Sequence, residues 1–140
     1  MNSPQVALLP DGRRLHLQHG PIDLVIEAFG TQEEIGAAYR QARDRFETIL
    51  SELVEELPAL RKPAPPDWRP QGAVAARMVD AVRPHNDLFV TPMAAVAGSV
   101  ADEVMASMVS GREIEKAYIN NSGDISVYIT PGQTLRLGIV

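Results

Sequence analysis

The 140 residues are about the length of one domain, and 45% apolar with 22% charged residues is typical of a chain that folds around a single core. Thirteen basic against eighteen acidic residues leave a net charge of −5, which disfavours nucleic acid as a partner. Because cysteine is absent and only three histidines are present, disulfides, thiol chemistry and Cys-ligated zinc are excluded.

The N-terminus lacks a signal-peptide pattern, and the longest apolar run, residues 93–101, is about half a membrane span. We therefore expect a cytoplasmic protein that makes no membrane contact.

The first thirty residues predict an antiparallel meander of three strands. Apolar and polar residues alternate at 15–18 and 22–28, and a short apolar segment at 6–9 precedes them. Turn signals at 10–12 and 19–21 separate the three segments, as in consecutive hairpins.

A long amphipathic helix is predicted next. Thr31 and Glu34 fit a capping box, in which side-chain oxygens satisfy free amides at a helix start. Apolar residues then recur every three or four positions as far as Leu57, which predicts one continuous helix that stops before Pro58. Its polar face is interpreted as solvated surface rather than as a catalytic carboxylate pair.

Five of the eleven prolines lie within 58–70, so we expect an extended connector over 58–72 inside a single domain that covers residues 1–140. Trp68, the only tryptophan, is interpreted as an aromatic anchor for this connector, with a ligand-stacking platform as the alternative. The apolar pattern then predicts a short helix at 74–82 and a short strand at 88–90.

The second half predicts another helix followed by strands. Thr91 and Pro92 favour a helix start, and small apolar residues nearly all round the first half of that helix indicate an internal position. Strands are expected at 116–121, 125–130 and 135–140. The predicted fold class is α+β, with a mostly antiparallel sheet, one long amphipathic helix and one buried small-residue helix.

Two segments offer binding chemistry. A helix that starts at Thr91 presents free amides and a positive dipole end to phosphate, and Gly98 permits close approach, although both residues also suit an ordinary helix. A polar loop separates two of the predicted strands; its residues are Asn120, Asn121, Ser122, Gly123 and Asp124. Asp124 suits Mg²⁺ or a ribose hydroxyl, and the loop equally suits a plain hairpin turn. Asp102 adjoins the apolar half of the helix and must face solvent, a partner or a cleft.

The runs AAVAGSVADEV at 94–104 and AYINNSGDI at 117–125 resemble the ApbE-like superfamily. The whole chain is similar to the N-terminal half of its uncharacterised, cytoplasmic branch. ApbE proteins are Mg²⁺-dependent flavin transferases that bind FAD and move its FMN part onto a protein threonine. The resemblance implies an ApbE-like fold, FAD or FMN with Mg²⁺ as cofactors, and a nucleotide bordered by Gly98, Asp102, Gly123 and Asp124.

This sequence departs from the transferases at Ala97, where they usually carry lysine, and at Ser122, where they carry glycine. The metal-binding residues of the transferases lie in a second half, so we expect this chain to bind a nucleotide without transferring it. The predicted site consists of Thr91, Gly98, Asp102, Asn120, Asn121, Ser122, Gly123 and Asp124.

Two other functions remain open. One is a non-catalytic assembly module, whose sheet is completed by a partner, a second copy or a missing C-terminal half; the strand-like residues up to Val140 suggest it. The other is a small-molecule enzyme that uses His85 and Asp87.

Overall fold

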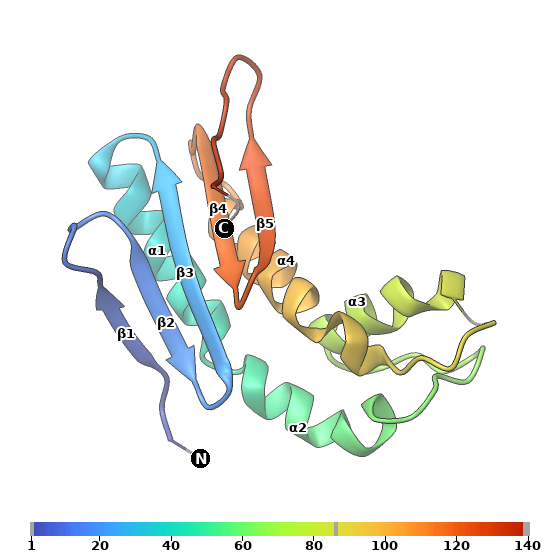
Figure 1. Ribbon diagram of the computed structural model, residues 1–140. Coiled ribbons are helices and arrows are strands. Elements are labelled where there is room, and N and C mark those ends of the chain that lie inside the picture. The colour runs from blue at the N-terminus through green and yellow to red at the C-terminus, as the bar shows by residue number, and fades with distance from the viewer. Residues whose placement is uncertain (1, 86, 139–140) are drawn as a thin grey trace.

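The computed structural model describes residues 2–85 and 87–138. Five antiparallel strands form one sheet in the order β1-β2-β3-β4-β5, so the predicted α+β class and the mostly antiparallel sheet are confirmed. Helices α1 and α4 lie behind this sheet, whereas α2 and α3 extend beyond it to one side (Figure 1). The molecule therefore has a sheet end and a helical end.

The predicted N-terminal meander is confirmed. Strands β1 (Gln5–Leu8), β2 (Leu15–His19) and β3 (Ile22–Phe29) pair in sequence order. Alternate residues of β2 and β3 are buried, as the period of two requires. These residues form the sheet side of the hydrophobic core, together with two buried residues of β4. The full set is Leu15, Leu17, Leu24, Ile26, Ala28, Ala117 and Ile119.

The expected single helix is wrong, because the structure has two helices there. Helix α1 (Gln32–Phe46) begins as predicted, with the Thr31 hydroxyl accepting from the Glu34 amide at 3.2 Å. A turn then separates α1 from α2 (Ile49–Leu60). The apolar spacing is similar on both sides of the break, because both helices bury one stripe, so periodicity alone does not reveal the change of direction.

Helix α2 also continues through Pro58, so the predicted end before that residue is wrong. A proline near a helix C-terminus forfeits one backbone hydrogen bond, and the last turn still closes through the Arg61 amide and the Leu57 carbonyl. The connector therefore starts three residues later than expected. Trp68 packs against the core, which confirms its interpretation as an anchor.

Helix α3 (Ala73–Val82) is confirmed, and a side chain from α2 fixes its start. The Glu56 carboxylate accepts from the amides of Gln71 and Gly72 at 2.7 and 3.0 Å, so a negative group sits at the positive end of α3. The short helix η1 (Arg83–His85) follows. The expected strand at 88–90 is wrong: Leu88 and Phe89 are 62% and 91% exposed, with no strand beside them in the described part of the chain.

The second major helix starts differently from the prediction. A 3₁₀ helix, η2 (Pro92–Ala95), comes first and leads into α4 (Val96–Val109). Thr91 precedes η2, but its hydroxyl makes no capping hydrogen bond within the described residues. The predicted helix start is confirmed in position, because Thr91 is the N-cap and Pro92 the first residue of η2, and the turn closes through the Ala94 amide and the Thr91 carbonyl.

Strands β4 (Lys116–Asn121) and β5 (Asp124–Ile129) confirm the predicted hairpin, and β5 forms one edge of the sheet. The expected last strand is wrong for residues 135–138, which pair with no strand; residues 139–140 lie outside the described part. Instead, the segment after β5 returns in front of the sheet (Figure 1), and the Lys116 ammonium donates to the Thr134 carbonyl at 2.7 Å.

Candidate functional site

An apolar groove of about 550 Å³ lies where the sheet end meets the helical end. Helix α2 forms one wall and the start of α4 the other, while the β2–β3 turn and the β4–β5 turn close the end nearest the sheet. Most of the lining is aliphatic, including Leu50, Val54, Leu57, Val96, Ala97 and Val100. The size and the apolar lining are typical of pockets for small organic ligands.

The composition of α4 explains why this groove exists. The predicted internal position holds for Val100, Ala101 and Val104, which are buried. In the first turn of α4, Val96 and Ala97 are only half-buried, and they line the groove together with Val100. A helix that is apolar almost all round thus leaves one apolar face without a partner among the described residues.

Asn121 holds the β4–β5 turn against the start of α4. Its side chain is 6% exposed, and its amide nitrogen donates to the Ala97 carbonyl at 3.1 Å. With the turn in this position, both Asn121 and Ser122 line the groove. Two separate predicted segments, the small-residue helix and the polar loop, do meet here.

The polar loop is a tight two-residue turn. Asn121 pairs with Asp124 across it, and Ser122 and Gly123 have φ angles of +52° and +100°. Positive φ at both central positions defines the type I′ turn that suits a hairpin. The Gly123 amide donates to the Asn120 side-chain oxygen at 2.8 Å, which occupies a donor that a phosphate would need.

The remaining predicted residues lie away from the groove lining. The Asn120 side chain belongs to the opposite face of the sheet and lines a hollow there with Tyr118 and residues of the C-terminal segment. Gly98 and Asp102 lie on α4, and Thr91 precedes η2. A Cβ at Gly98 would meet nothing within 4 Å, so the glycine is not required there by close packing. Asp102 and Asp124 are both exposed.

Arg61 is a groove residue that the sequence analysis did not identify. It follows the last turn of α2, is exposed, and is the only cation among the groove-lining residues described. A helix of twelve residues is about 18 Å long, so Arg61 lies far from Leu50, which contacts the β2–β3 turn. The groove thus has polar amide and hydroxyl groups near one end and a positive charge near the other.

Glu103, next to Asp102 in the chain, has a structural role. Its carboxylate accepts from Arg45 at 2.8 Å and from Arg77 at 3.0 Å, and Arg45 also binds Glu52 at 2.9 Å. We call Arg45, Glu52, Arg77 and Glu103 the ion cluster; it joins α1, α2, α3 and α4. Burial opposes ionisation of Glu103, but hydrogen bonds from the two arginines outweigh it and lower its pKa.

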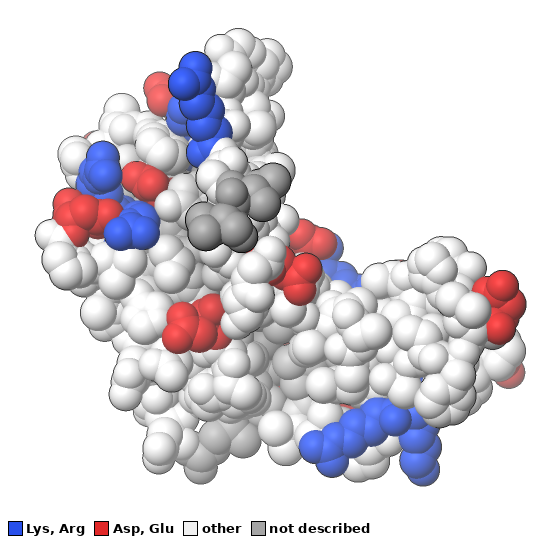
Figure 2. All heavy atoms as spheres, viewed as in Figure 1, with Lys and Arg blue, Asp and Glu red and all other residues white. Residues whose placement is uncertain are grey.

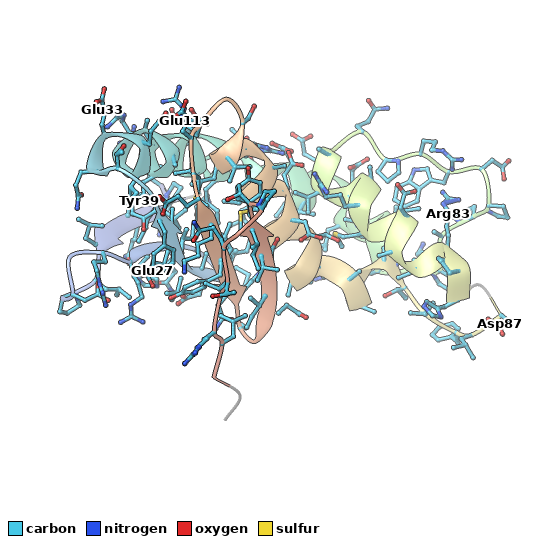
Figure 3. All side chains as sticks on the ribbon, turned by 90° about the horizontal axis from the view of Figure 1, so that it is seen from above. Glu27, Glu33, Tyr39, Arg83, Asp87 and Glu113 are labelled. Carbon is cyan, nitrogen blue, oxygen red and sulfur yellow. The ribbon has the colours of Figure 1, made fainter. Side chains whose placement is uncertain are left out.

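A second hollow, of about 410 Å³, lies at the other end of the sheet, near the end of β3 and the start of α1. Glu27 and Tyr39, both labelled in Figure 3, line it. The Tyr39 hydroxyl accepts from the Ala28 amide at 3.1 Å and donates to the Arg13 carbonyl at 2.6 Å, where β2 has turned away from β3. Burial raises the pKa of Tyr39. This tyrosine lies on the apolar stripe of α1, so its spacing in the sequence suggests core packing only.

Within residues 2–85 and 87–138, no group of three or more His, Asp or Glu side chains is arranged to hold a metal ion. The predicted carboxylates Asp102 and Asp124 supply no complete ligand set, and Mg²⁺ binding stays a prediction. His85 and Asp87 are exposed near the tip of the helical end, where Figure 3 labels Asp87; residue 86 between them is outside the described part.

None of the helices in the described parts of the chain has the length and hydropathy to cross a membrane. No curated protein matches the sequence. A match to a known family covers residues 6–140, and it includes both walls of the groove and the β4–β5 turn. The chain therefore belongs to the family described as AbpE bacteria.

Proposed function

We propose that this chain is a cytoplasmic protein that binds a flavin or a related nucleotide, FMN or FAD, in the apolar groove. The observation that carries the proposal is the meeting of the small-residue helix α4 with the turn residues Asn121 and Ser122 at one pocket of about 550 Å³. The resemblance of these two segments to ApbE-like proteins supports the choice of ligand class.

The groove chemistry suits an amphipathic ligand with a flat ring and an anionic tail. Aliphatic side chains such as Leu57 and Val96 would cover the ring, because burying apolar surface is favourable. Arg61 would pair with phosphate through its planar guanidinium. The Asn121 and Ser122 side chains, at the other end, would contact the polar edge of the ring.

The same lining favours binding over catalysis. Among the described residues that line the groove, none is Asp, Glu or His, so no general acid or base faces the proposed ligand. A chain with this lining would hold or deliver a flavin rather than transfer its FMN part by itself.

Flavin binding can be tested by titrating FMN, FAD and AMP into the purified chain and measuring flavin fluorescence and heat of binding. Val54→Asp places a charge in the groove at a residue that is 45% exposed, and we expect at least a tenfold loss of affinity. Val127→Asp is the matched control, since Val127 is 49% exposed on β5 and lies outside the groove lining.

Arg61→Gln should weaken FMN more than riboflavin, which lacks the phosphate, while Arg69→Gln, on the connector, should change neither. The absence of saturable binding by both FMN and FAD, or equal losses in the Val54 and Val127 variants, would refute the proposed site.

A second candidate function is a non-catalytic assembly module, which the edge strands favour. Strand β5 exposes Ile125, Val127 and Ile129 by 43%, 49% and 47%, and β1 at the other edge exposes Val6 and Leu8 by 43% and 57%. Open edges with apolar side chains invite pairing with another strand. Light scattering tests this candidate: association that Val127→Asp abolishes would support it, and a monomer at all concentrations would rule it out.

A further inference from the structure

The helical end carries an exposed apolar tip. Leu88 and Phe89 are 62% and 91% exposed, so nearly the whole phenyl ring is in contact with solvent. Soluble proteins rarely leave an aromatic side chain this exposed next to another large apolar residue unless the pair serves a contact. We call residues 87–89 the tip.

The tip projects away from the body of the molecule. Figure 3 shows Asp87 at the extreme end of the helical region, on the side opposite the sheet. The chain after the tip is fixed, because Pro92 is buried and the Ala94 amide donates to the Thr91 carbonyl. Phe89 itself is exposed and is not among the residues that line the groove of its own chain.

The groove has the complementary properties. Its aliphatic walls, which include Leu57 and Val96, lack a covering segment among the described residues. Its volume of about 550 Å³ accommodates a phenyl ring and a leucine side chain. A second copy of the chain offers such a pair at its tip.

Charge also matches between the two surfaces. Asp87 directly precedes Leu88 and Phe89, and Arg61 lines the groove. Both side chains are exposed, and neither takes part in an ion pair within residues 2–85 and 87–138. Opposite charges beside an apolar contact favour one orientation and one partner.

We propose that the tip of one copy inserts into the apolar groove of a second copy, with Asp87 facing Arg61 across the contact. One tip buries much less surface than the 1,200–2,000 Å² or so of a stable interface. A twofold dimer contains two such contacts and therefore buries twice this area. Because the total is still small, we expect a weak dimer, with a dissociation constant on the order of 100 µM.

This dimer and the proposed flavin use the same groove and exclude one another. The contact needs no ligand, so it is measured on the flavin-free chain. Failure of the dimer leaves the flavin proposal untouched, and failure of flavin binding leaves the dimer untouched.

Sedimentation velocity of the flavin-free full chain, over about a hundredfold range of concentration that spans the expected constant, tests the proposal. The wild-type chain shifts from monomer to dimer. Phe89→Ser removes the inserted ring, and Val54→Asp charges the groove; each weakens association at least tenfold. Val127→Asp, on the edge strand β5, leaves it unchanged. Circular dichroism confirms that each variant is folded.

A mixture of two variants tests the proposed contact more strictly than the single variants do. The Phe89→Ser chain keeps its groove and the Val54→Asp chain keeps its tip, so a mixture forms one intact contact and associates more than either chain alone. The charge swap Asp87→Arg with Arg61→Asp restores association that either single change weakens. A wild-type chain that stays monomeric throughout, as closure of the tip on its own groove would produce, overturns the proposal. So does a dimer that Val127→Asp abolishes and Phe89→Ser does not.

Discussion

The sheet end and the helical end of this molecule are held together by different interactions. At the sheet end, antiparallel pairing fixes five strands, and alternate residues of β2, β3 and β4 bury their side chains under α1 and α4. At the helical end, α2 and α3 also bury apolar residues in the same core, and charged side chains in addition bind distant groups of α2, the connector and α3. Strand pairing therefore supports the burial at one end, and a few specific polar contacts support it at the other.

The contacts at the helical end span long stretches of sequence. Arg83 donates to the carbonyls of Pro66 and Trp68 at 2.8 and 2.6 Å, and Glu56 holds the start of α3. Figure 3 shows Arg83 beside the connector. On the face in Figure 2, charged atoms of the helical end lie at its lower edge and far tip; at the junction with the sheet end, red and blue atoms lie in the upper notch, and the surface below them is mostly white. The ion cluster connects the two ends, because it joins α1 and α4 to α2 and α3.

The largest effect is expected from Glu103→Gln, which breaks the ion cluster. The Glu103 side chain is 14% exposed and binds arginines from α1 and α3, so losing its charge leaves both guanidinium groups weakly satisfied. We expect the free energy of unfolding to fall by about 2–3 kcal/mol in urea denaturation. The neighbouring Asp102→Asn, at an exposed position, should change it by less than about 0.5 kcal/mol. Equal effects would show that Glu103 does not connect the two ends.

Low pH should weaken the ion cluster and so lower the free energy of unfolding. Hydrogen bonding to Arg45 lowers the pKa of Glu52, and the two arginines lower that of Glu103, below the usual value of 4.5. The unfolded chain then binds more protons than the folded chain near this pH, so stability is complete above pH 4.5 and is lost as the pH falls through the lowered pKa values.

Urea denaturation at about pH 6 and about pH 3 measures this loss. The decrease should be smaller in Glu103→Gln than in the wild type. Asp11 at the sheet end, whose pKa is lowered by hydrogen bonds from the backbone amides of Arg13 and Arg14, titrates in both chains and provides a common background. Identical pH profiles would contradict a role for the cluster.

At the sheet end, Tyr39→Phe removes the hydroxyl that bridges Ala28 and Arg13. The Ala28 amide then lacks a protein partner where β2 has left β3, and we expect a loss of about 1–2 kcal/mol. Tyr128→Phe, on β5, is the control, because the Tyr128 hydroxyl makes no hydrogen bond within the described residues. A similar loss in both variants would assign the effect to ring packing.

The smallest effect is expected from Arg83→Gln, which releases the connector. Two hydrogen bonds to the backbone are lost, one exposed and one partly buried, at a cost of about 1 kcal/mol, and the fluorescence of Trp68 should shift to longer wavelength as its ring becomes more solvated. Arg69→Gln is the control, because among the described residues the Arg69 side chain binds only the carbonyl of the adjacent residue. An unchanged spectrum in the Arg83 variant would mean that packing alone holds the connector.

The sequence by itself determined the elements that depend on local spacing. The period of two set the strands β2 and β3, and the capping residue Thr31 set the start of α1. The turn at Ser122 and Gly123 was also apparent, because its residue types suit positive φ angles. These signals work because each one involves neighbours in the chain.

Tertiary structure alone decided the break between α1 and α2, the path of the segment after β5, and the apolar groove. The break does not interrupt the apolar spacing, and the last segment is strand-like in sequence but finds no strand to pair with among the described residues. Of the predicted site residues, only Asn121 and Ser122 line the groove, whereas Arg61 lines it without any sequence signal. Which polar residues share a pocket depends on how distant elements pack, and the periodicity within one segment does not determine that packing.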